Sequence, residues 1–285
     1  MQQNEKNKVE SSTLYLVGTP IGNLADMTER AKKVLSEVDF VAAEDTRNSM
    51  KLLSCFGIHT ELVSYFEHNK RESGERIVQR LLGGESCALI TDAGMPAISD
   101  PGEDLVRLCQ ESGVAVRVVP GPSACVSALA LSGLSTVRFA FEGFLPAQKN
   151  DRRKRLEAVA NDDRTLIFYE APHKLRATLD DMAEIFGAER KIALCRELTK
   201  LNEEAVRTSL ADAVKLYREK EPRGEYVLVI EGGSGKAKEE NPLLSLSPEE
   251  HVAHYESQGV KRMDAIKMAA KDRGMPKSEL YKLLV

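Results

Sequence analysis

Acidic residues, glycines and prolines gather at three points where a short apolar run ends. Residues 18–23 read GTPIGN, residues 43–47 read AEDTR, and residues 91–102 contain two carboxylates, two prolines and two glycines. Glycine allows a backbone to approach a ligand closely. Carboxylates accept protons or bind hydroxyl groups, and a guanidinium holds a phosphate or neutralises acids. The pattern indicates a ligand site built from loops, although a structural ion pair explains the second run equally well.

A fourth loop, residues 120–124 with the sequence PGPSA, precedes an apolar helical segment. Free backbone N–H groups at a helix start can hold a polar or anionic ligand group. Ser123 stands where it can cap this helix or contact a ligand, and both interpretations stay open.

The elements that must position these loops follow a βαβ rhythm from residue 13 to residue 119. This rhythm predicts a mainly parallel sheet covered on both faces, and ligands of such sheets bind beyond the carboxyl ends of the strands. We expect a helix that starts at Asp26 with Glu29 completing a capping box, and that buries Ala31, Val34, Leu35 and Val38. The expected strands are residues 14–17, 40–43, 62–65, 87–90 and 114–119.

A second α/β unit follows the turn at residues 120–122. Its expected strands are residues 138–141, 165–169, 192–196 and 226–230, and its expected helices are residues 153–160, 175–186 and 210–219. Residues 232–242, rich in Gly, Lys and Glu, are typical of a linker. This linker departs from a phosphate-binding loop because Ile230 occupies the first glycine position and Ala237 the Ser or Thr position.

Three short helices are expected after the linker, at residues 248–257, 261–273 and 277–284, with a tight turn at Gly274 between the last two. From Val260 onward the chain has seven Lys or Arg against three Asp or Glu. A helix-turn-helix layout with this charge favours a nucleic-acid contact, and a packing appendage is the alternative. The predicted domains are therefore residues 13–121, 122–232 and 243–285.

Composition limits the class of protein. The 285 residues carry a net charge of −4, so nucleic-acid binding must be local rather than spread over the whole surface. The five cysteines form no C-x-x-C pair and are expected to be buried thiols of a reducing compartment. His251 and His254 have helical spacing but no third ligand nearby, so no metal is expected. Without an apolar leader or a membrane-length apolar stretch, we expect a cytoplasmic protein with no membrane contact.

Eight motifs in order resemble the ribosomal RNA ribose methyltransferase branch of the tetrapyrrole-methylase superfamily. They span roughly residues 14–231 and are followed by a C-terminal module like that of this branch. The motifs are VGTPIGN at 17–23, AEDTR at 43–47, residues 91–102, VPGPSA at 119–124, EGFLP at 142–146, YEAPH at 169–173, RELTK at 196–200 and GEYV at 224–227. Ile21 stands where tetrapyrrole-modifying relatives have the proline of a G-x-G-P-G loop. This difference weakens the hypothesis that the substrate is a porphyrinoid.

The resemblance implies a two-domain α/β fold of the tetrapyrrole-methylase type, with S-adenosyl-L-methionine in the cleft between the domains. It also implies a homodimer that methylates the 2'-oxygen of a cytidine ribose in the decoding centre of 16S rRNA, within the 30S subunit. Methylation of a tetrapyrrole or another small molecule is the alternative. The implied cofactor wall consists of Asp92, Ala93, Gly94, Ala97, Ser123, Ala124, Tyr169, Glu170 and Leu198.

Catalytic and RNA-binding candidates complete the expected site. Asp45 is the first candidate for a base or hydroxyl orienter and Asp100 the second, while His173 is interpreted as structural. The expected RNA contacts are Arg47, the tract Lys149, Arg152, Arg153, Lys154 and Arg155, and the tip residues Lys261 and Arg262.

Two other classes of protein are alternatives to a methyltransferase. A nicotinamide oxidoreductase would place a ribose-binding acid near Glu44, but Gly18-x-x-x-Gly22 is not its G-x-G-x-x-G fingerprint. A non-catalytic RNA-binding module would leave the cleft loops without a role. Binding of S-adenosyl-L-methionine without NADH excludes the first class, and turnover excludes the second.

Overall fold

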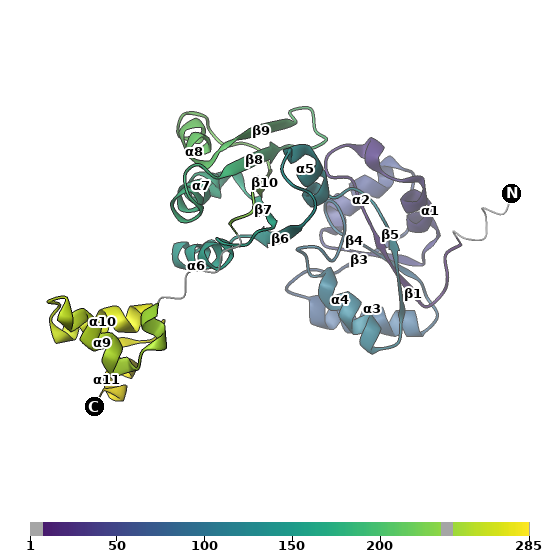
Figure 1. Ribbon diagram of the computed structural model, residues 1–285. Helices are drawn as coiled ribbons and strands as arrows, with labels where there is room; N and C mark the ends of the chain where they lie inside the picture. The colour runs from purple at the N-terminus through teal and green to yellow at the C-terminus, as the bar shows by residue number, and fades with distance from the viewer. Residues whose placement is uncertain (1–7, 235–241, 285) are drawn as a thin grey trace. The chain divides into compact units, whose positions relative to one another are not determined.

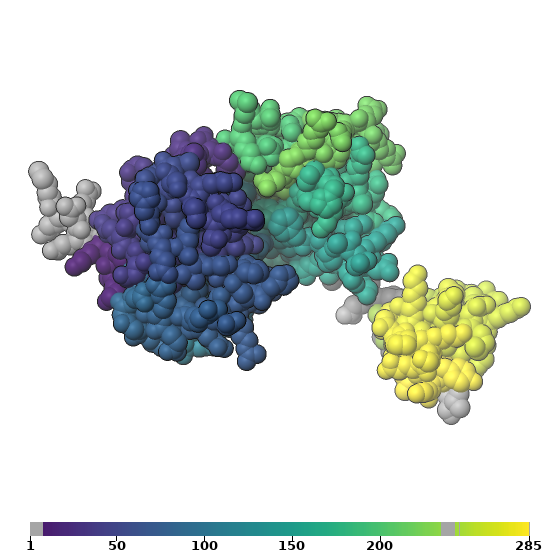
Figure 2. All heavy atoms as spheres, turned by 180° about the vertical axis from the view of Figure 1, so that it is seen from behind, coloured from purple at the N-terminus to yellow at the C-terminus, as the bar shows by residue number. Residues whose placement is uncertain are grey.

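The computed structural model describes residues 8–234 and 242–284. These residues form two compact units, one holding both α/β parts up to residue 231 and one holding residues 161–163 with the chain from residue 232 onward. Within the first unit the two α/β parts form one continuous body, coloured purple to blue and teal to green in Figure 2. Residues 235–241, most of the expected linker, lie outside the described residues.

The first sheet is fully parallel, with the order β3-β2-β4-β1-β5. Figure 1 labels β1, β3, β4 and β5 of this sheet. Each strand was predicted from the sequence, with ends that differ by at most one residue, because short apolar runs bounded by turn residues favour strands over helices. The strands are β1 (Thr13–Val17), β2 (Phe40–Ala43), β3 (Glu61–Ser64), β4 (Cys87–Ile90) and β5 (Ala115–Val119).

Helices and side-chain layers cover both faces of this sheet, as predicted. Val41 and Ala43 pack into one core cluster, and Phe40 and Ala42 pack into another. The alternation follows from the two-residue period of a strand. The connecting elements are the 3-10 helix η1 (Leu24–Asp26) and the helices α1 (Glu29–Glu37), α2 (Thr46–Cys55), α3 (Lys70–Leu82) and α4 (Gly102–Glu111).

The predicted start of the first helix at Asp26 is wrong. Asp26 ends the 3-10 turn η1, and α1 begins after Thr28, whose Oγ1 accepts a hydrogen bond from the Ala31 N–H at 3.1 Å. Asn23 caps the turn by accepting from the Ala25 N–H. Asn23 and Thr28 each cap a separate helical element, so residues 24–37 are divided into η1 and α1. The sequence alone does not reveal which cap starts the longer helix.

The second sheet is mixed, with the order β6-β7-β10-β8-β9. Strands β6 and β7 are parallel and the other neighbouring pairs are antiparallel. The sequence did not predict β9, because four of the six residues in its EAVRTS run are polar and all six are partly or fully exposed at the sheet edge. The strands are β6 (Phe139–Phe144), β7 (Thr165–Glu170), β8 (Lys191–Arg196), β9 (Glu204–Ser209) and β10 (Tyr226–Ile230).

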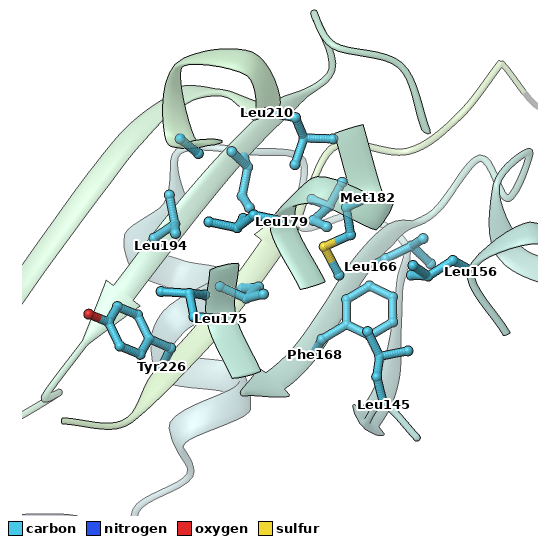
Figure 3. Close-up of a cluster of buried hydrophobic side chains, with 14 of the residues drawn as sticks. Leu145, Leu156, Leu166, Phe168, Leu175, Leu179, Met182, Leu194, Leu210 and Tyr226 are labelled. Carbon is cyan, nitrogen blue, oxygen red and sulfur yellow. The ribbon is translucent and has the colours of Figure 1, made fainter. Parts of the chain in front are cut away.

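The larger core of the second part lies between this sheet and helices α7 (Pro172–Phe186) and α8 (Leu210–Glu219). Figure 3 shows Phe168 and Leu166 of β7 packed beside Met182 of α7. Helix α5 (Ala124–Ser132) covers the opposite face of the sheet. Helix α6 (Lys149–Val159) begins four residues before the predicted start at residue 153.

The C-terminal unit is a small helical body with its own core of Val252, Ile266 and Leu280. Gly274, at φ +65°, makes the turn between α10 (Arg262–Asp272) and α11 (Lys277–Leu283), so the expected helix-turn-helix layout is present. The unit also contains η2 (Pro242–Ser245) and α9 (Pro248–Ser257).

Four of the five cysteines are buried, as expected from the sequence, and His251 is buried in the C-terminal unit. Cys87, Cys109, Cys125 and Cys195 are buried and Cys55 is exposed. His251 is fully buried, and its Nδ1 accepts a hydrogen bond from Arg273 at 3.1 Å. The described residues contain no group of three or more His, Cys, Asp or Glu placed to hold a metal. Within residues 8–234 and 242–284, no helix combines the length and apolarity needed to cross a bilayer.

Candidate active site

A cavity of about 570 Å³ lies beyond the carboxyl ends of β1, β2 and β4, where its walls come from both α/β parts. Its volume is within the range of about 300 to 1,000 Å³ found for small-molecule sites. The lining residues are Ile21, Glu44, residues 91–95, residues 98–100, Ser123, Ala124, Phe144, residues 169–173, Cys195, Glu197, Leu198, Lys200 and residues 225–227.

Gly18 and Gly121 allow the backbones of two strand-end loops to pack directly against each other, so these glycines serve loop packing rather than ligand access. A Cβ on Gly18 would lie 2.7 Å from the Cα of Gly121, and a Cβ on Gly121 would lie 2.8 Å from the Cα of Gly18. Thr19 and Gly94 exchange backbone hydrogen bonds of 2.9 and 3.2 Å. The loops after β1, β4 and β5 are therefore fixed to one another, which gives the cavity a preformed floor.

Asp100 organises the loop that follows β4. Its carboxylate accepts hydrogen bonds from the N–H groups of Ala97 at 3.0 Å, Ile98 at 3.3 Å and Gly102 at 2.7 Å. Ala97 and Ser99 have φ of +67° and +64°, a region that is costly for residues other than glycine. Asp100 lines the cavity, and both of its oxygens are engaged in holding this backbone.

We expect Asp100→Ala to lower the free energy of unfolding by about 2 kcal/mol, because three backbone donors lose a charged acceptor. Urea unfolding followed by circular dichroism measures this change. Glu103→Ala, in the first turn of α4, is the control and should unfold close to the wild type. Equal midpoints for Asp100→Ala and the wild type would show that the loop holds its shape without Asp100.

Asp45 lies next to the cavity but is not among the residues that line it. It caps α2 by accepting from the Arg47 N–H at 2.9 Å, and Arg47 Nη2 lies 3.0 Å from Asp45 Oδ2. The bonds from Arg47 lower the pKa of Asp45 to about 2. The structural ion pair that the sequence left open is therefore present, and a carboxylate with so low a pKa is a weak proton acceptor.

Glu44 is the carboxylate at the end of β2 that does line the cavity. It accepts a hydrogen bond from Thr91 Oγ1 at 3.3 Å, and among the described residues no Lys, Arg or His forms an ion pair with it. Partial desolvation at the cavity edge, followed by the nearby charge of Asp92, raises its pKa above the ordinary value of 4.5, although the residue stays exposed to solvent. A raised pKa and a free oxygen are the properties of a proton acceptor.

Sequence reasoning did not choose Glu44 as a catalytic candidate, although one signal was available. Asp45 precedes a helical segment and is a preferred residue type for an N-cap. An aspartate used as a cap turns toward the helix backbone, which leaves the preceding glutamate as the side chain at the tip of the strand.

Eight of the nine residues implied as a cofactor wall line the cavity, and Ala97 does not. Leu198 is buried, and the hydroxyl of Tyr169 accepts from the Cys125 N–H at 3.2 Å. Glu170 is also buried, and its carboxylate accepts from the Ala171 N–H at 2.8 Å and from Thr178 Oγ1 at 2.5 Å. Asp92 accepts a bond from Asn48 Nδ2 at 3.3 Å.

All three arginines of the basic tract are held by carboxylates. Arg152 is buried, with its Nη2 2.6 Å from Asp181 Oδ2, and Arg153 bridges Asp181 and Glu184 at 2.9 and 2.6 Å. Arg155 pairs with a further acid, Glu142. Asp181, a buried acid on α7, explains why Arg152 and Arg153 occupy the first turns of α6, where the helix dipole disfavours cations.

The remaining RNA-binding candidates are more exposed. Lys149 is an exposed residue at the start of α6, and the Lys154 ammonium lies 3.9 Å from Asp151 on the same helix. In the C-terminal unit, Lys261 is the exposed N-cap of α10, and Arg262 lies 3.5 Å from Glu256. The structure therefore brings eight residues of the implied cofactor wall together, whereas the basic residues of the tract and the tip are spread over α6 and the C-terminal unit and several of them are paired with acids.

The two sheets and the cavity at the strand ends define a protein of the tetrapyrrole-methylase fold. Residues 13–214 match the family model of Tetrapyrrole (Corrin/Porphyrin) Methylases, so the chain belongs to this family and the resemblance is confirmed. A uroporphyrin-III C-methyltransferase from Thermus thermophilus, complexed with S-adenosyl homocysteine, superposes with a TM-score of 0.55 at 19% identity. That structure covers 77% of this chain and 97% of its own.

Relatives named ribosomal RNA small subunit methyltransferase I are much more similar. The relative from Halalkalibacterium halodurans is 50% identical over 283 residues, covering 99% of this chain and 98% of its own. The relative from Bacillus subtilis is 46% identical and covers 98% of this chain and 96% of its own. The prediction of a methyltransferase is thereby confirmed.

Proposed function

We propose that this protein uses S-adenosyl-L-methionine to methylate a ribose 2'-oxygen in 16S rRNA of the small ribosomal subunit. The observation that carries the proposal is the 50% identity to a ribosomal RNA small subunit methyltransferase I over 283 residues. That match includes the C-terminal helical unit, whereas the Thermus uroporphyrin enzyme covers 77% of this chain. A shared appendage with a basic tip favours an RNA substrate over a small one.

The cavity is suited to the proposed cofactor. Ala93, Gly94 and Ala124 leave room beside its floor, while Leu198 and Val227 provide a buried apolar wall. When bound, S-adenosyl-L-methionine supplies an electrophilic methyl group on a sulfonium. Because the positive charge disperses as the methyl is transferred, small neutral residues near the sulfur favour the reaction better than a carboxylate does.

Within this proposal, the residues of the cavity position the ribose and accept its proton. The preformed floor aligns the hydroxyl with the methyl group, and alignment of this kind contributes on the order of 7 to 11 kcal/mol. Glu44 accepts or orients the hydroxyl proton, a role worth roughly 10² to 10⁴ in rate. Asp45 and Asp100 support the site by capping α2 and by shaping the loop after β4.

The target and setting are part of the same proposal. The methylated nucleotide is a cytidine of the decoding centre, presented by the assembled 30S particle in the cytoplasm to a homodimer. Domains 13–121 and 122–232 bind the cofactor, and domain 243–285 binds RNA. Arg47, Lys149, Lys154, Lys261 and Arg262 contact phosphates. Arg152, Arg153 and Arg155 keep their structural pairs.

Methylation of a tetrapyrrole is the second candidate, favoured by the name of the matching family and by the Thermus structure. Incubation with labelled S-adenosyl-L-methionine and either 30S subunits or a reduced uroporphyrin separates the two candidates. The RNA proposal predicts label in the 30S fraction alone. Label in the tetrapyrrole and none in RNA would overturn it.

A further inference from the structure

Two apolar side chains that line the cavity are strongly exposed. Phe144, at the end of β6, is 58% exposed, and Ile98, in the loop after β4, is 51% exposed. The apolar wall formed by Leu198, Tyr226 and Val227 is buried in contrast. An exposed apolar surface beside a cavity is typical of a site that a ligand covers.

The direction of Phe144 is set by an irregularity in β6. The pairing of β6 with β7 is interrupted between Phe141 and Gly143, and Gly143 has φ of +65°. A bulge of this kind redirects the side chain that follows it. A Cβ on Gly143 would lie 3.1 Å from Ser99 Oγ, so the end of β6 packs closely against the loop that contains Ile98.

A rigid aromatic support lies behind Phe144. Its ring contacts the ring of Tyr169 edge to face, with centroids 5.4 Å apart and an interplanar angle of 65°. Tyr169 is itself fixed by Phe141, at a centroid distance of 4.8 Å, and by the hydrogen bond from the Cys125 N–H. Phe144 therefore presents a ring held in place before any ligand arrives.

We propose that Phe144 is the stacking platform for the base of the nucleotide whose ribose is methylated, with Ile98 as a second apolar contact. This inference rests on the proposed function. A nucleotide must leave the stack of its neighbours before its 2'-oxygen can enter a cavity, and proteins hold such a base on aromatic side chains. Since every base has a flat face, Phe144 supports the nucleotide without selecting its identity.

The cofactor is not the ligand that covers Phe144. The buried wall of Leu198, Tyr226 and Val227 already offers an adenosyl group an enclosed apolar surface. A ligand that arrives from solvent after the cofactor contacts the exposed side chains at the mouth. The proposal therefore predicts that Phe144 affects RNA methylation but not cofactor affinity.

The first test compares Phe144→Ala, Phe144→Tyr and the matched control Phe139→Ala. Phe139 lies on the same strand, is 42% exposed and does not line the cavity. We expect Phe144→Ala to lower kcat/KM for unmethylated 30S subunits by about 10-fold to 100-fold, as expected for the loss of one stacked base. Phe144→Tyr and Phe139→Ala should stay within about threefold of the wild type.

Affinity for S-adenosylhomocysteine, measured by calorimetry, separates the two possible ligands. An unchanged affinity in Phe144→Ala supports a base platform, and a tenfold loss would place the cofactor there and overturn the proposal. Unchanged kcat/KM in Phe144→Ala would also overturn it. If the wild type itself transfers no methyl group to 30S subunits, the proposed function fails, which is a distinct result.

A photocrosslink tests the contact directly. p-Benzoylphenylalanine replaces Phe144 in one variant and Phe139 in another, and the 30S complexes are irradiated with S-adenosylhomocysteine present. We expect position 144 to crosslink to the nucleotide that the wild type methylates, and position 139 to give no such product. A crosslink from position 144 to S-adenosylhomocysteine, or to no nucleotide, would contradict the proposal.

Discussion

Glu44→Gln is expected to lower kcat for methyl transfer by about 10²-fold to 10⁴-fold while the protein stays folded, because an amide cannot accept the proton of the ribose hydroxyl. Glu44 lines the cavity, and among the described residues it accepts a side-chain hydrogen bond from Thr91 Oγ1 alone and forms no ion pair with a Lys, Arg or His. Single-turnover transfer to 30S subunits at saturating cofactor measures this effect on the chemical step.

The matched control is Asp45→Asn, one residue further along. Asparagine is as good an N-cap as aspartate, so α2 keeps its start, and the variant should retain most of the wild-type rate. A large loss in Asp45→Asn together with full activity in Glu44→Gln would return the catalytic role to Asp45.

The pH dependence of the rate gives an independent check on Glu44. Partial desolvation and the charges of Asp92, Asp100 and Asp45 raise the pKa of Glu44 above 4.5, so its ionised, accepting form is lost as pH falls through this raised pKa. The wild-type rate should therefore rise with pH across that value and then level off. Glu44→Gln should lack this rise, whereas Asp45→Asn should keep it.

Asp181→Ala is expected to lower the free energy of unfolding by about 3 to 5 kcal/mol, since it leaves a buried guanidinium without its partner. The side chains of Arg152 and Asp181 are 8% and 6% exposed, and they meet at 2.6 Å. Chemical denaturation followed by circular dichroism measures the change.

Glu184→Ala is the control for Asp181→Ala. Glu184 pairs with Arg153, but its side chain is 66% exposed, so its removal should cost less than about 1 kcal/mol. Equal losses of unfolding free energy for the two variants would show that the buried Arg152–Asp181 ion pair does not stabilise the packing of α6 on α7. A small effect for both would contradict the structural role assigned to Arg152.

The architecture was largely predictable because its signals are local. Runs such as Phe40–Ala43 and Tyr226–Ile230 are apolar throughout, and they occur as the buried strands β2 and β10. Strand β9 escaped prediction because an edge strand with EAVRTS carries no alternating apolar pattern. The start of α1 escaped it because Asp26 and Thr28 are both suitable caps, and tertiary packing decides between them.

The cavity was predictable in outline because parallel strands bring their carboxyl ends to one edge of a sheet. The loops after β2 and β4 therefore meet, and Glu44 lies beside Thr91. The sequence carried a hint of which carboxylate faces the cavity, because Asp45 is a preferred N-cap residue, but its capping bond is visible only in the structure. The sequence could not show that Asp181, 29 residues from Arg152, turns part of a basic tract into a buried ion pair.

The location of the transferred methyl group tests the proposed function most directly. Labelled S-adenosyl-L-methionine is incubated with the full chain and 30S subunits that lack the modification, and the 16S rRNA is digested and analysed by mass spectrometry. We expect label on the ribose 2'-oxygen of a cytidine in the decoding centre. Label on a base, or no transfer to 30S subunits despite cofactor binding, would contradict it.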